Sequence, residues 1–316
     1  MPPLLVFGHP TQQMLARLAE HFEIHTLAEK PDGWLAEHGA GIRHATLVGH
    51  GRIDGAMLDQ LPNLQLISNY GVGYDTIDAA ECARRGVLVT HTPDVLNAEV
   101  ATTAIMLMMA CYRELLRDEA YVRSGRWEAE GSAPLTRSVD GQKIGILGMG
   151  RIGQEIARKL SVFDPEISYH TRTPKDVPYR YFDTLVGLAA HVDCLMVITP
   201  GGASTHHIVN AEVLEALGPQ GTVINVARGT VIDEAAMIAA LQSGKLGWAG
   251  LDVFEREPHV PEALRALSNV VLLPHVGSGT VETRAAMGNL VVDNLIDHLT
   301  KGTVRTPVPE CKALAG

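Results

Sequence analysis

Short apolar stretches alternate with amphipathic stretches along almost the whole chain. The apolar stretches are nearly continuous and rich in β-branched residues, which is typical of strands that are buried on both faces of a parallel sheet. They lie at residues 4–7, 45–48, 64–68, 87–90, 143–147, 167–171, 194–199, 222–226, 248–253 and 270–274. Patterns with helical spacing fill the gaps, for example at residues 11–22, 152–162, 212–217 and 234–243. This alternation predicts right-handed crossovers and open, doubly wound sheets.

Two longer helical patterns interrupt the alternation. One runs from Asn97 to about Ser124, and the other runs from Thr280 to about Leu299. Each lies between an outer and an inner set of strand–helix units. We therefore predict an α/β fold with two doubly wound parallel-sheet domains, in which residues 1–98 and 285–316 form one domain and residues 99–284 form the other. Folds of this kind bind their ligands in a cleft, which we expect between the domains.

Composition narrows the class of protein. The chain has 316 residues, of which 46% are hydrophobic and 20% charged, as expected for a globular protein of two domains. Its formal net charge is −10, and no run of five basic residues offsets it. An acidic surface repels nucleic acid and anionic membranes. An anionic substrate would therefore need a cation placed inside its binding pocket.

The cysteines and the N-terminus point to the cytoplasm. The four cysteines are far apart and form no CxxC pair, so we expect neither a zinc knuckle nor a redox dithiol, and no metal site at all. No signal segment precedes the first predicted strand, and the longest apolar stretch, near residues 104–111, is too short to span a membrane. The cysteines are interpreted as reduced packing residues.

A glycine-rich turn follows the predicted strand at 143–147 and opens a helix. It reads Gly148, Met149, Gly150, Arg151, Ile152 and Gly153. A lone GxGxxG pattern is weak, but a strand before it and a helix after it are the context of a dinucleotide site. Gly148 permits the tight turn, Gly150 lets the backbone approach a pyrophosphate, and Gly153 lets helix and strand pack closely. The helix N-terminus adds a partial positive charge.

The end of the next strand distinguishes NAD from NADP. An acidic residue there binds the ribose 2′-hydroxyl in NAD enzymes. This chain has Thr171, Arg172 and Thr173 instead, followed by Lys175. The hydroxyls can donate to a 2′-phosphate and the planar guanidinium can grip it. We predict that NADPH is preferred over NADH. The alternative is that these residues form a solvated basic loop that binds no phosphate.

Three chemically distinctive residues follow, each at the end of a predicted strand of the same domain. They are Arg228, Glu257 and His275. The carboxyl ends of parallel strands converge on one crevice, so the three side chains are expected to meet there. A single arginine is usually a surface residue and a single histidine usually a packing residue. The joint placement downstream of a nucleotide motif favours a catalytic set.

The chemistry of hydride transfer to a carbonyl needs these residue types. The cofactor delivers hydride to the carbonyl carbon, and the oxygen then needs a proton, which a histidine commonly supplies. A carboxylate at Glu257 would orient His275 and stabilise its charged form. Arg228 would hold the substrate carboxylate with two hydrogen bonds. The predicted reaction is reduction of a small 2-oxo acid to a 2-hydroxy acid.

At these residues the chain resembles the D-isomer-specific 2-hydroxyacid dehydrogenases, over essentially its whole length. Residues 225–229, 252–258 and 274–279 carry the resemblance. Within that family it looks closest to the NADPH-dependent glyoxylate/hydroxypyruvate reductases and the plant hydroxyphenylpyruvate reductases. The resemblance implies a Rossmann cofactor domain inserted in a flavodoxin-like substrate (lid) domain. It also implies the D product, with glyoxylate or hydroxypyruvate as the expected substrate.

The resemblance implies further roles. The catalytic acid of the family stands just before the proline, which selects Glu257 over Glu255. A glycine loop of the outer domain presents backbone N–H groups to the substrate carboxylate, here those of Val72 and Gly73. Asp252 would contact the nicotinamide carboxamide. Relatives form homodimers through the cofactor domain, so a homodimer is expected.

Two rival functions remain open at this stage. A formate dehydrogenase would share the architecture, but it carries glutamine where this chain has Glu257. A nucleotide-sensing corepressor would keep the catalytic set, bind NADPH and turn over no 2-oxo acid. For His50, in an outer-domain loop, a packing or solvent role is favoured over substrate selection.

Overall fold

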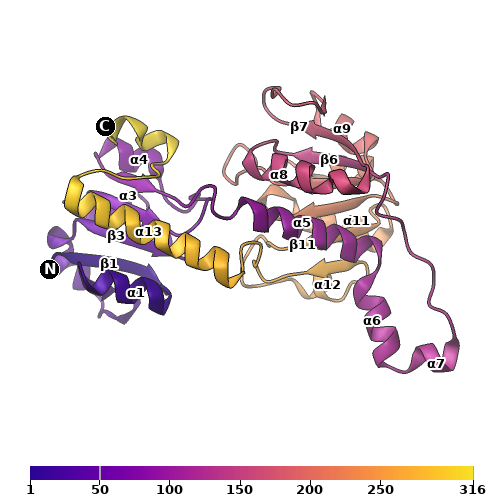
Figure 1. Ribbon diagram of the computed structural model, residues 1–316, viewed down its shortest axis with the longest axis horizontal. Helices are drawn as coiled ribbons and strands as arrows, with labels where there is room; N and C mark the ends of the chain where they lie inside the picture. Colours follow the sequence, from indigo (N-terminus) through magenta and orange to yellow (C-terminus); the bar gives the residue numbers. More distant parts are fainter. Residues whose placement is uncertain (50, 316) are drawn as a thin grey trace. The chain divides into compact units, whose positions relative to one another are not determined.

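Parallel strands and helices alternate through the computed structural model, which describes residues 1–49 and 51–315. The chain divides into two units (Figure 1). Unit 1 comprises Met1–Leu96 with Thr280–Gly316, and unit 2 comprises Asn97–Gly279. The sequence-based boundary at 284/285 falls inside helix α13 (Val281–Lys301). The observed boundary precedes that helix because Thr280 caps it, accepting a hydrogen bond from the Thr283 N–H.

Unit 1 is built on a sheet of five parallel strands in the order β2-β1-β3-β4-β5. This is the flavodoxin-like order that was predicted for the outer domain. The strands are β1 (Pro3–Gly8), β2 (Glu23–Thr26), β3 (His44–Val48), β4 (Leu66–Asn69) and β5 (Leu88–Thr90). The helices are α1 (Gln12–Ala19), α2 (Trp34–His38), α3 (Gly55–Asp59), α4 (Ala79–Arg84) and α13, with 3₁₀ turns at Leu27–Glu29, Gly39–Gly41 and Pro309–Leu314.

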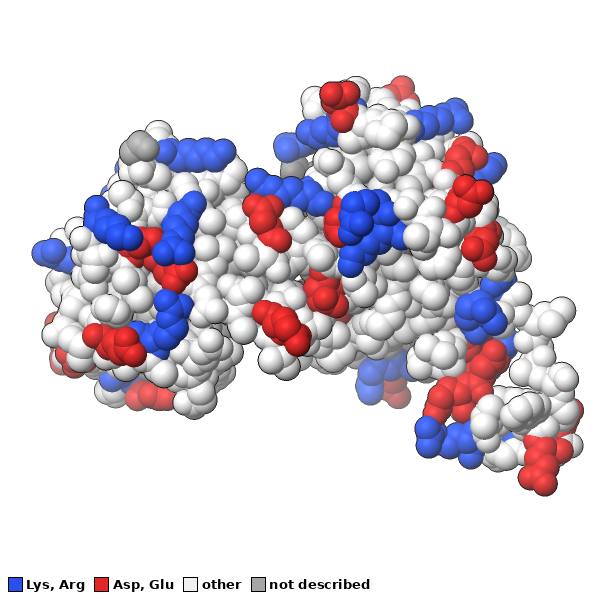
Figure 2. Space-filling view, viewed as in Figure 1, with Lys and Arg blue, Asp and Glu red and all other residues white. Residues whose placement is uncertain are grey.

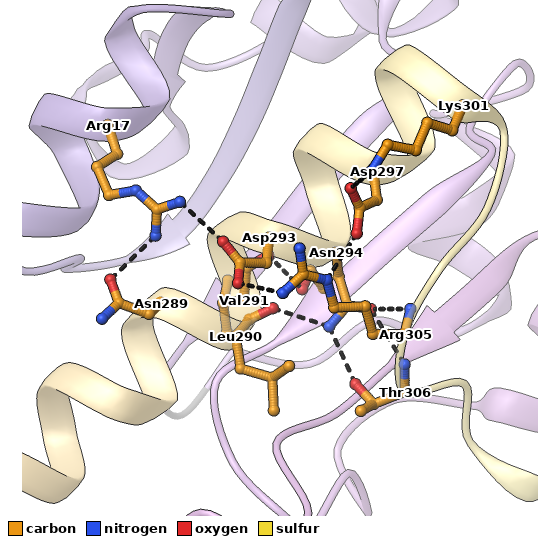
Figure 3. Close-up of polar contacts among 11 residues, drawn as sticks. Arg17, Asn289, Leu290, Val291, Asp293, Asn294, Asp297, Lys301, Arg305 and Thr306 are labelled. Atoms are coloured by element: carbon orange, nitrogen blue, oxygen red, sulfur yellow. Dashed lines mark hydrogen bonds and ion pairs between the residues drawn. The ribbon is translucent and has the colours of Figure 1, made fainter.

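Helix α13 returns the chain to the unit in which it began. Its buried residues Val291, Val292 and Leu295 join the core formed by β1, β3 and β4. A polar network fastens its outer side (Figure 3): Arg17 of α1 donates to Asp293, and Arg305 donates to both Asp293 and Asp297. These ion pairs join segments that are far apart in the sequence, so the last part of the chain is an integral part of unit 1.

Unit 2 is built on seven parallel strands in the order β12-β11-β10-β9-β6-β7-β8. Counted within the unit, this is the Rossmann order 3-2-1-4-5-6 with one further strand, which confirms the predicted fold class. The strands are β6 (Lys143–Leu147), β7 (Glu166–His170), β8 (Arg180–Tyr181), β9 (Cys194–Val197), β10 (Thr222–Asn225), β11 (Trp248–Leu251) and β12 (Val270–Leu272).

Helices cover both faces of this sheet. They are α5 (Asn97–Tyr112), α6 (Leu115–Arg123), α7 (Arg126–Glu130), α8 (Arg151–Leu160), α9 (Leu185–His191), α10 (Ala211–Leu217), α11 (Glu234–Ser243) and α12 (Glu262–Arg265), with 3₁₀ turns at Ser161–Phe163 and Gly229–Val231. None of the helices in residues 1–49 and 51–315 combines the length and the apolar character needed to cross a lipid bilayer.

The prediction of one long helix from Asn97 to about Ser124 is wrong. Helix α5 ends at Tyr112, and α6 begins at Leu115 after a break at Glu114. Glu114 adopts a left-handed conformation with φ 43°, which an α-helix cannot contain. Its carboxylate pairs with Arg117 at 2.5 Å in the first turn of α6. The chain therefore turns away from the sheet, and α6 and α7 project from unit 2 (Figure 1).

Candidate active site

The glycine-rich turn of unit 2 joins β6 to α8. Gly148 has φ +107°, and a Cβ there would lie 2.9 Å from the backbone nitrogen of Thr199. A Cβ at Gly153 would lie 2.2 Å from the carbonyl oxygen of Gly148, so helix and turn touch directly. Both positions therefore require glycine for the close packing of the turn.

Gly150 differs from the other two glycines. It is the N-cap of α8, it makes no side-chain capping bond, and a Cβ built on it would meet no described heavy atom within 4 Å. The N–H groups of the first helical turn, which begins with exposed Arg151, are thus approachable by an anion. Met149 is buried in the core and contributes only its backbone, while Ile152 is half-buried. The turn fits a dinucleotide pyrophosphate.

The loop after β7 presents a basic and a hydroxyl side chain. Arg172 and Thr173 are exposed, whereas the Thr171 hydroxyl donates to the Thr173 carbonyl at 2.7 Å. The hydroxyl of buried Tyr169 accepts from Lys175 N–H at 2.8 Å and donates to its carbonyl at 3.1 Å. The loop is therefore folded back on its own strand, with Arg172 at its outer side. No carboxylate ends the strand, since its last residue is His170.

Arg228 stands in a turn that Asn225 organises. The Asn225 side chain accepts from the Ala227 N–H at 3.0 Å and donates to the Arg228 carbonyl at 3.0 Å. Arg228 itself donates from its guanidinium to the Ala227 carbonyl at 2.8 Å. At the next position, a Cβ on Gly229 would lie 1.9 Å from the carbonyl carbon of Phe254. The segment that carries Arg228 thus packs by its backbone against the segment that carries Glu257.

Glu257 and His275 are in direct contact. One carboxylate oxygen of Glu257 lies 2.7 Å from Nδ1 of His275, and the other accepts from the Phe254 N–H at 3.0 Å. The Glu257 side chain is 15% exposed and the His275 side chain is 40% exposed. A carboxylate held by its own backbone segment therefore orients an imidazole that reaches the surface.

Asp252 has a role that the sequence did not reveal. His275 has a left-handed backbone with φ 54°, and its N–H donates to the Asp252 carbonyl at 2.8 Å. The two carboxylate oxygens of Asp252 accept from the N–H groups of Val276 and Gly277, each at 2.7 Å. Burial raises the pKa of Asp252, although these two N–H donors act in the opposite direction. Asp252 holds the loop that presents His275.

The predicted carboxylate-binding loop lies in unit 1. Asn69 donates to the carbonyls of Gly71 and Gly73, Thr92 N–H donates to Gly71, and the Val72 carbonyl contacts Nδ1 of His91 at 3.0 Å. The carbonyl groups are therefore all engaged within the unit. The N–H groups of Val72 and Gly73 meet no acceptor in the part of the chain that the structure describes. Such a loop suits an anion.

The predicted site residues are divided between the two units of the chain. Arg228, Glu257 and His275 all come from strand ends of unit 2, whereas Val72 and Gly73 belong to unit 1. Glu255 does not join Glu257 at His275 but contacts His207. His50 lies outside the described residues.

Comparisons with known proteins identify the family and the fold. Residues 105–277 match the model of the D-isomer specific 2-hydroxyacid dehydrogenase, NAD binding domain. The chain is 48% identical over 275 residues to a glyoxylate/hydroxypyruvate reductase A of Arabidopsis thaliana (87% of this chain, 88% of the relative). It is 46% identical to a hydroxyphenylpyruvate reductase of Plectranthus scutellarioides (87% and 88%). A crystal structure of NADPH-dependent glyoxylate/hydroxypyruvate reductase from Sinorhizobium meliloti, with NADP and malonate, matches with a TM-score of 0.91 at 46% identity (98% of each chain).

Proposed function

The chain belongs to the D-isomer-specific 2-hydroxyacid dehydrogenase family, and we propose that it uses NADPH to reduce glyoxylate or hydroxypyruvate to the D-2-hydroxy acid. It is an oxidoreductase of that family; the cofactor and the substrate are the proposal. The observation that carries it is the 2.7 Å contact between Glu257 and His275, beside the Arg228 segment. The names of the plant and bacterial relatives support the substrate class.

The cofactor site is proposed on two features of unit 2. NADPH, when bound, supplies a hydride to the carbonyl carbon. The turn at Gly148, Gly150 and Gly153 would hold the pyrophosphate against the N-terminus of α8. Exposed Arg172 and Thr173 would bind the 2′-phosphate. Because Thr171 already donates within the loop, its role would be to shape that loop.

Proton delivery is assigned to Nε2 of His275. Nδ1 is the nitrogen that faces Glu257, so the opposite nitrogen is the one that would carry a proton to the carbonyl oxygen. The Glu257 carboxylate would stabilise the charged imidazole before transfer. Asp252 would keep the His275 loop in place, and by family analogy it would also contact the nicotinamide carboxamide.

Substrate binding is assigned to one cation and one backbone loop. Arg228 would pair with the substrate carboxylate and so offset the repulsion from a chain of net charge −10. The N–H groups of Val72 and Gly73 would bind the same carboxylate. Neither rival function gains support, since Glu257 is not glutamine and the relatives reported above are named as reductases.

We also propose a cytoplasmic homodimer paired through unit 2. All four cysteines are free and buried, which suits a reducing compartment. Helices α5 to α7 and the segment that follows them expose large apolar side chains, namely Met106, Met109, Leu115, Leu116, Val122, Trp127 and Leu135. Figure 2 shows white residues lying among paired blue and red ones on the projecting segment. Large apolar side chains that are exposed on one projecting segment favour an interface. Light scattering should give about twice the chain mass of 34.0 kDa.

Initial rates test the proposed reaction. NADPH and NADH are each oxidised with glyoxylate, hydroxypyruvate and phenylpyruvate, and formate with NADP⁺ is run in parallel. The proposal expects fast NADPH oxidation with glyoxylate or hydroxypyruvate and much slower oxidation of NADH. Turnover of formate, or tight NADPH binding without turnover of any 2-oxo acid, would contradict it.

Replacement of Arg172 tests the cofactor preference. Arg172→Ala should weaken NADPH by at least about tenfold, because a charge-assisted bond to phosphate is worth roughly 1.5–3 kcal/mol. NADH, which has no 2′-phosphate, should be unaffected. Arg158→Ala removes an exposed arginine of α8 that pairs with Glu155 and is the matched control. Equal losses for both cofactors would remove Arg172 from the phosphate site.

A further inference from the structure

A second cluster of ionisable side chains lies in unit 2, apart from the Glu257–His275 pair. Within residues 1–49 and 51–315, one group of three histidine, cysteine or acidic residues has its ligand atoms within 4.8 Å of one another: His206, His207 and Glu255. The two histidines follow β9, and Glu255 follows β11. With Thr230 and Arg256 they line a cavity of about 350 Å³.

The backbone at His207 turns both imidazoles to the same side. Consecutive side chains of an extended chain point in opposite directions. His207 instead has a left-handed conformation with φ 51°, and the rings of His206 and His207 stack with centroids 3.9 Å apart. Hydrogen bonds hold this turn, from His207 N–H to the Thr230 carbonyl at 2.8 Å and from Val209 N–H to Val231 at 3.1 Å. Strained backbone that is fastened in this way is common at functional sites.

The carboxylate of the cluster is also fixed. Glu255 forms a hydrogen bond with Nε2 of His207. Its own N–H donates to the carboxylate of buried Glu234 at 3.4 Å. The His207 and Glu255 side chains are 34% and 23% exposed, so a small ion could reach them from the cavity. His206 is the exposed member of the cluster.

We propose that His206, His207 and Glu255 bind one borderline divalent metal ion of the Zn²⁺ type. Two imidazole nitrogens and one carboxylate oxygen are a ligand set that zinc takes, with a fourth position left for water. Harder ions such as Mg²⁺ and Ca²⁺ need sites built from oxygen ligands, which this cluster does not provide. Arg256 at the rim of the cavity lowers the affinity for any cation, so the site is suited to a reversible ligand.

The same ion would restrain both segments that carry the proposed catalytic residues. Thr230 of the cavity stands two residues after Arg228, and Glu255 stands two residues before Glu257. The backbones of these segments touch at Gly229 and Phe254. Movement of Glu255 toward a metal would therefore displace the support of Glu257. This regulatory step rests on the proposed function and predicts that the ion slows turnover.

Binding is tested on untagged, metal-free enzyme. Co²⁺ is followed by its visible absorption and Zn²⁺ by calorimetry. We expect one ion per chain, and His206→Ala and Glu255→Gln should each weaken binding by at least about tenfold. His191→Ala is the matched control, because His191 also pairs with a glutamate, Glu166, at 2.7 Å.

The outcomes separate a metal site from a simple ion pair. Because His206 is exposed, His206→Ala should keep the melting temperature of the wild type, which shows that lost binding is not lost folding. Wild-type affinity in His206→Ala, or no saturable binding by the wild type, overturns the site. Equal weakening by His191→Ala would also overturn it, because binding would then be nonspecific.

Turnover tests the regulatory step separately. At a Zn²⁺ concentration that saturates the calorimetric site, kcat with NADPH and glyoxylate should fall at least about fivefold in the wild type but not in His206→Ala. Unchanged turnover with Zn²⁺ bound would refute the regulation and leave the site standing. If the enzyme reduces no 2-oxo acid, the proposed function fails, yet the binding experiment still decides the metal site.

Discussion

Two histidines of unit 2 pair with glutamates of the same short segment, but their surroundings differ. His275 meets Glu257 and His207 meets Glu255, and both histidines have a left-handed backbone, with φ 54° and 51°. His275 faces its carboxylate through Nδ1, whereas His207 does so through Nε2. In the first arrangement Nε2 is the nitrogen that points away from the glutamate. In the second arrangement Nε2 is the nitrogen that contacts the glutamate.

The support behind each pair also differs. The His275 loop is bonded to Asp252, which is 1% exposed and accepts from two of its N–H groups. The His207 turn is held by main-chain bonds, and its ring stacks on an exposed second imidazole. One histidine fixed by a buried carboxylate suits proton transfer, whereas two imidazoles beside one carboxylate suit a metal ion. On the proposals made above, the same pair of residue types would serve different chemistry because the backbone and the neighbouring residues differ.

Removal of His275 should have the largest effect on turnover. His275→Ala is expected to lower kcat with NADPH and glyoxylate by about a thousandfold, since general acid catalysis contributes roughly 10²–10⁴. The affinity for NADPH, measured by fluorescence, should be retained. His191→Ala, which disrupts the unrelated His191–Glu166 pair, should leave both values unchanged. A kcat within tenfold of the wild type would exclude His275 as the proton donor.

Replacement of Glu257 should have the next largest effect. Glu257→Gln keeps the shape of the side chain but removes the charge that stabilises protonated His275. We expect kcat to fall by about a hundredfold and activity to be lost at a lower pH on the alkaline side of the profile. Glu166→Gln is the matched control. An unchanged pH profile would show that Glu257 only packs against the ring.

Asp252→Asn tests the support of the loop. An amide can accept only one of the two N–H bonds of Val276 and Gly277, so the loop should loosen and kcat should fall by about tenfold. NADPH affinity should change by less than about threefold if Asp252 acts through His275. The control is Asp193→Asn, whose carboxylate also accepts a backbone N–H, from Lys143 at 2.8 Å. Weaker NADPH binding with unchanged kcat would instead assign Asp252 to the nicotinamide.

Much of this architecture could be predicted from the sequence, because buried parallel strands are almost purely apolar. One edge strand of each sheet was not predicted, because its residues are less apolar and less buried. Strand β2 (Glu23–Thr26) has no fully buried residue, and β8 is only Arg180–Tyr181. The break between α5 and α6 at Glu114 could not be predicted, because neither glycine nor proline occurs there. Such features arise from tertiary packing and not from local pattern.

Some residues of the candidate sites could likewise be predicted from the sequence, and others could not. Arg228, Glu257 and His275 could be proposed because each follows a strand whose end the topology places at one edge. The hydrogen bonds by which Asp252 holds the His275 loop could not be inferred, since its partners Val276 and Gly277 donate through backbone N–H groups, which every residue except proline has. The cluster of His206, His207 and Glu255 depends on a left-handed residue and on two loops brought together by the sheet.

A pair of histidines in unit 1, His44 and His298, differs from these histidine–glutamate pairs because it contains no carboxylate. His44 is 3% exposed, and its Nε2 lies 2.9 Å from Nδ1 of His298. Burial, together with the nearby charges of His298 and Arg43, lowers the pKa of His44 to about 4. Burial also lowers the pKa of His298. Without a carboxylate to stabilise a charged ring, this pair is held neutral.

This pair makes the stability of the enzyme depend on pH in one direction. Above the ordinary histidine pKa of 6.5 both folded and unfolded chains hold His44 neutral, so the full stability is present. Below it, the unfolded chain takes up a proton first, and stability falls until pH reaches about 4. We expect a loss of about 2 kcal/mol between pH 7 and pH 5, or a melting temperature lower by roughly 5 °C. His44→Gln, which can still donate to His298, should flatten this dependence, whereas replacement of exposed His9 by Gln should not. An equally steep dependence in His44→Gln would place the sensitivity elsewhere in the chain.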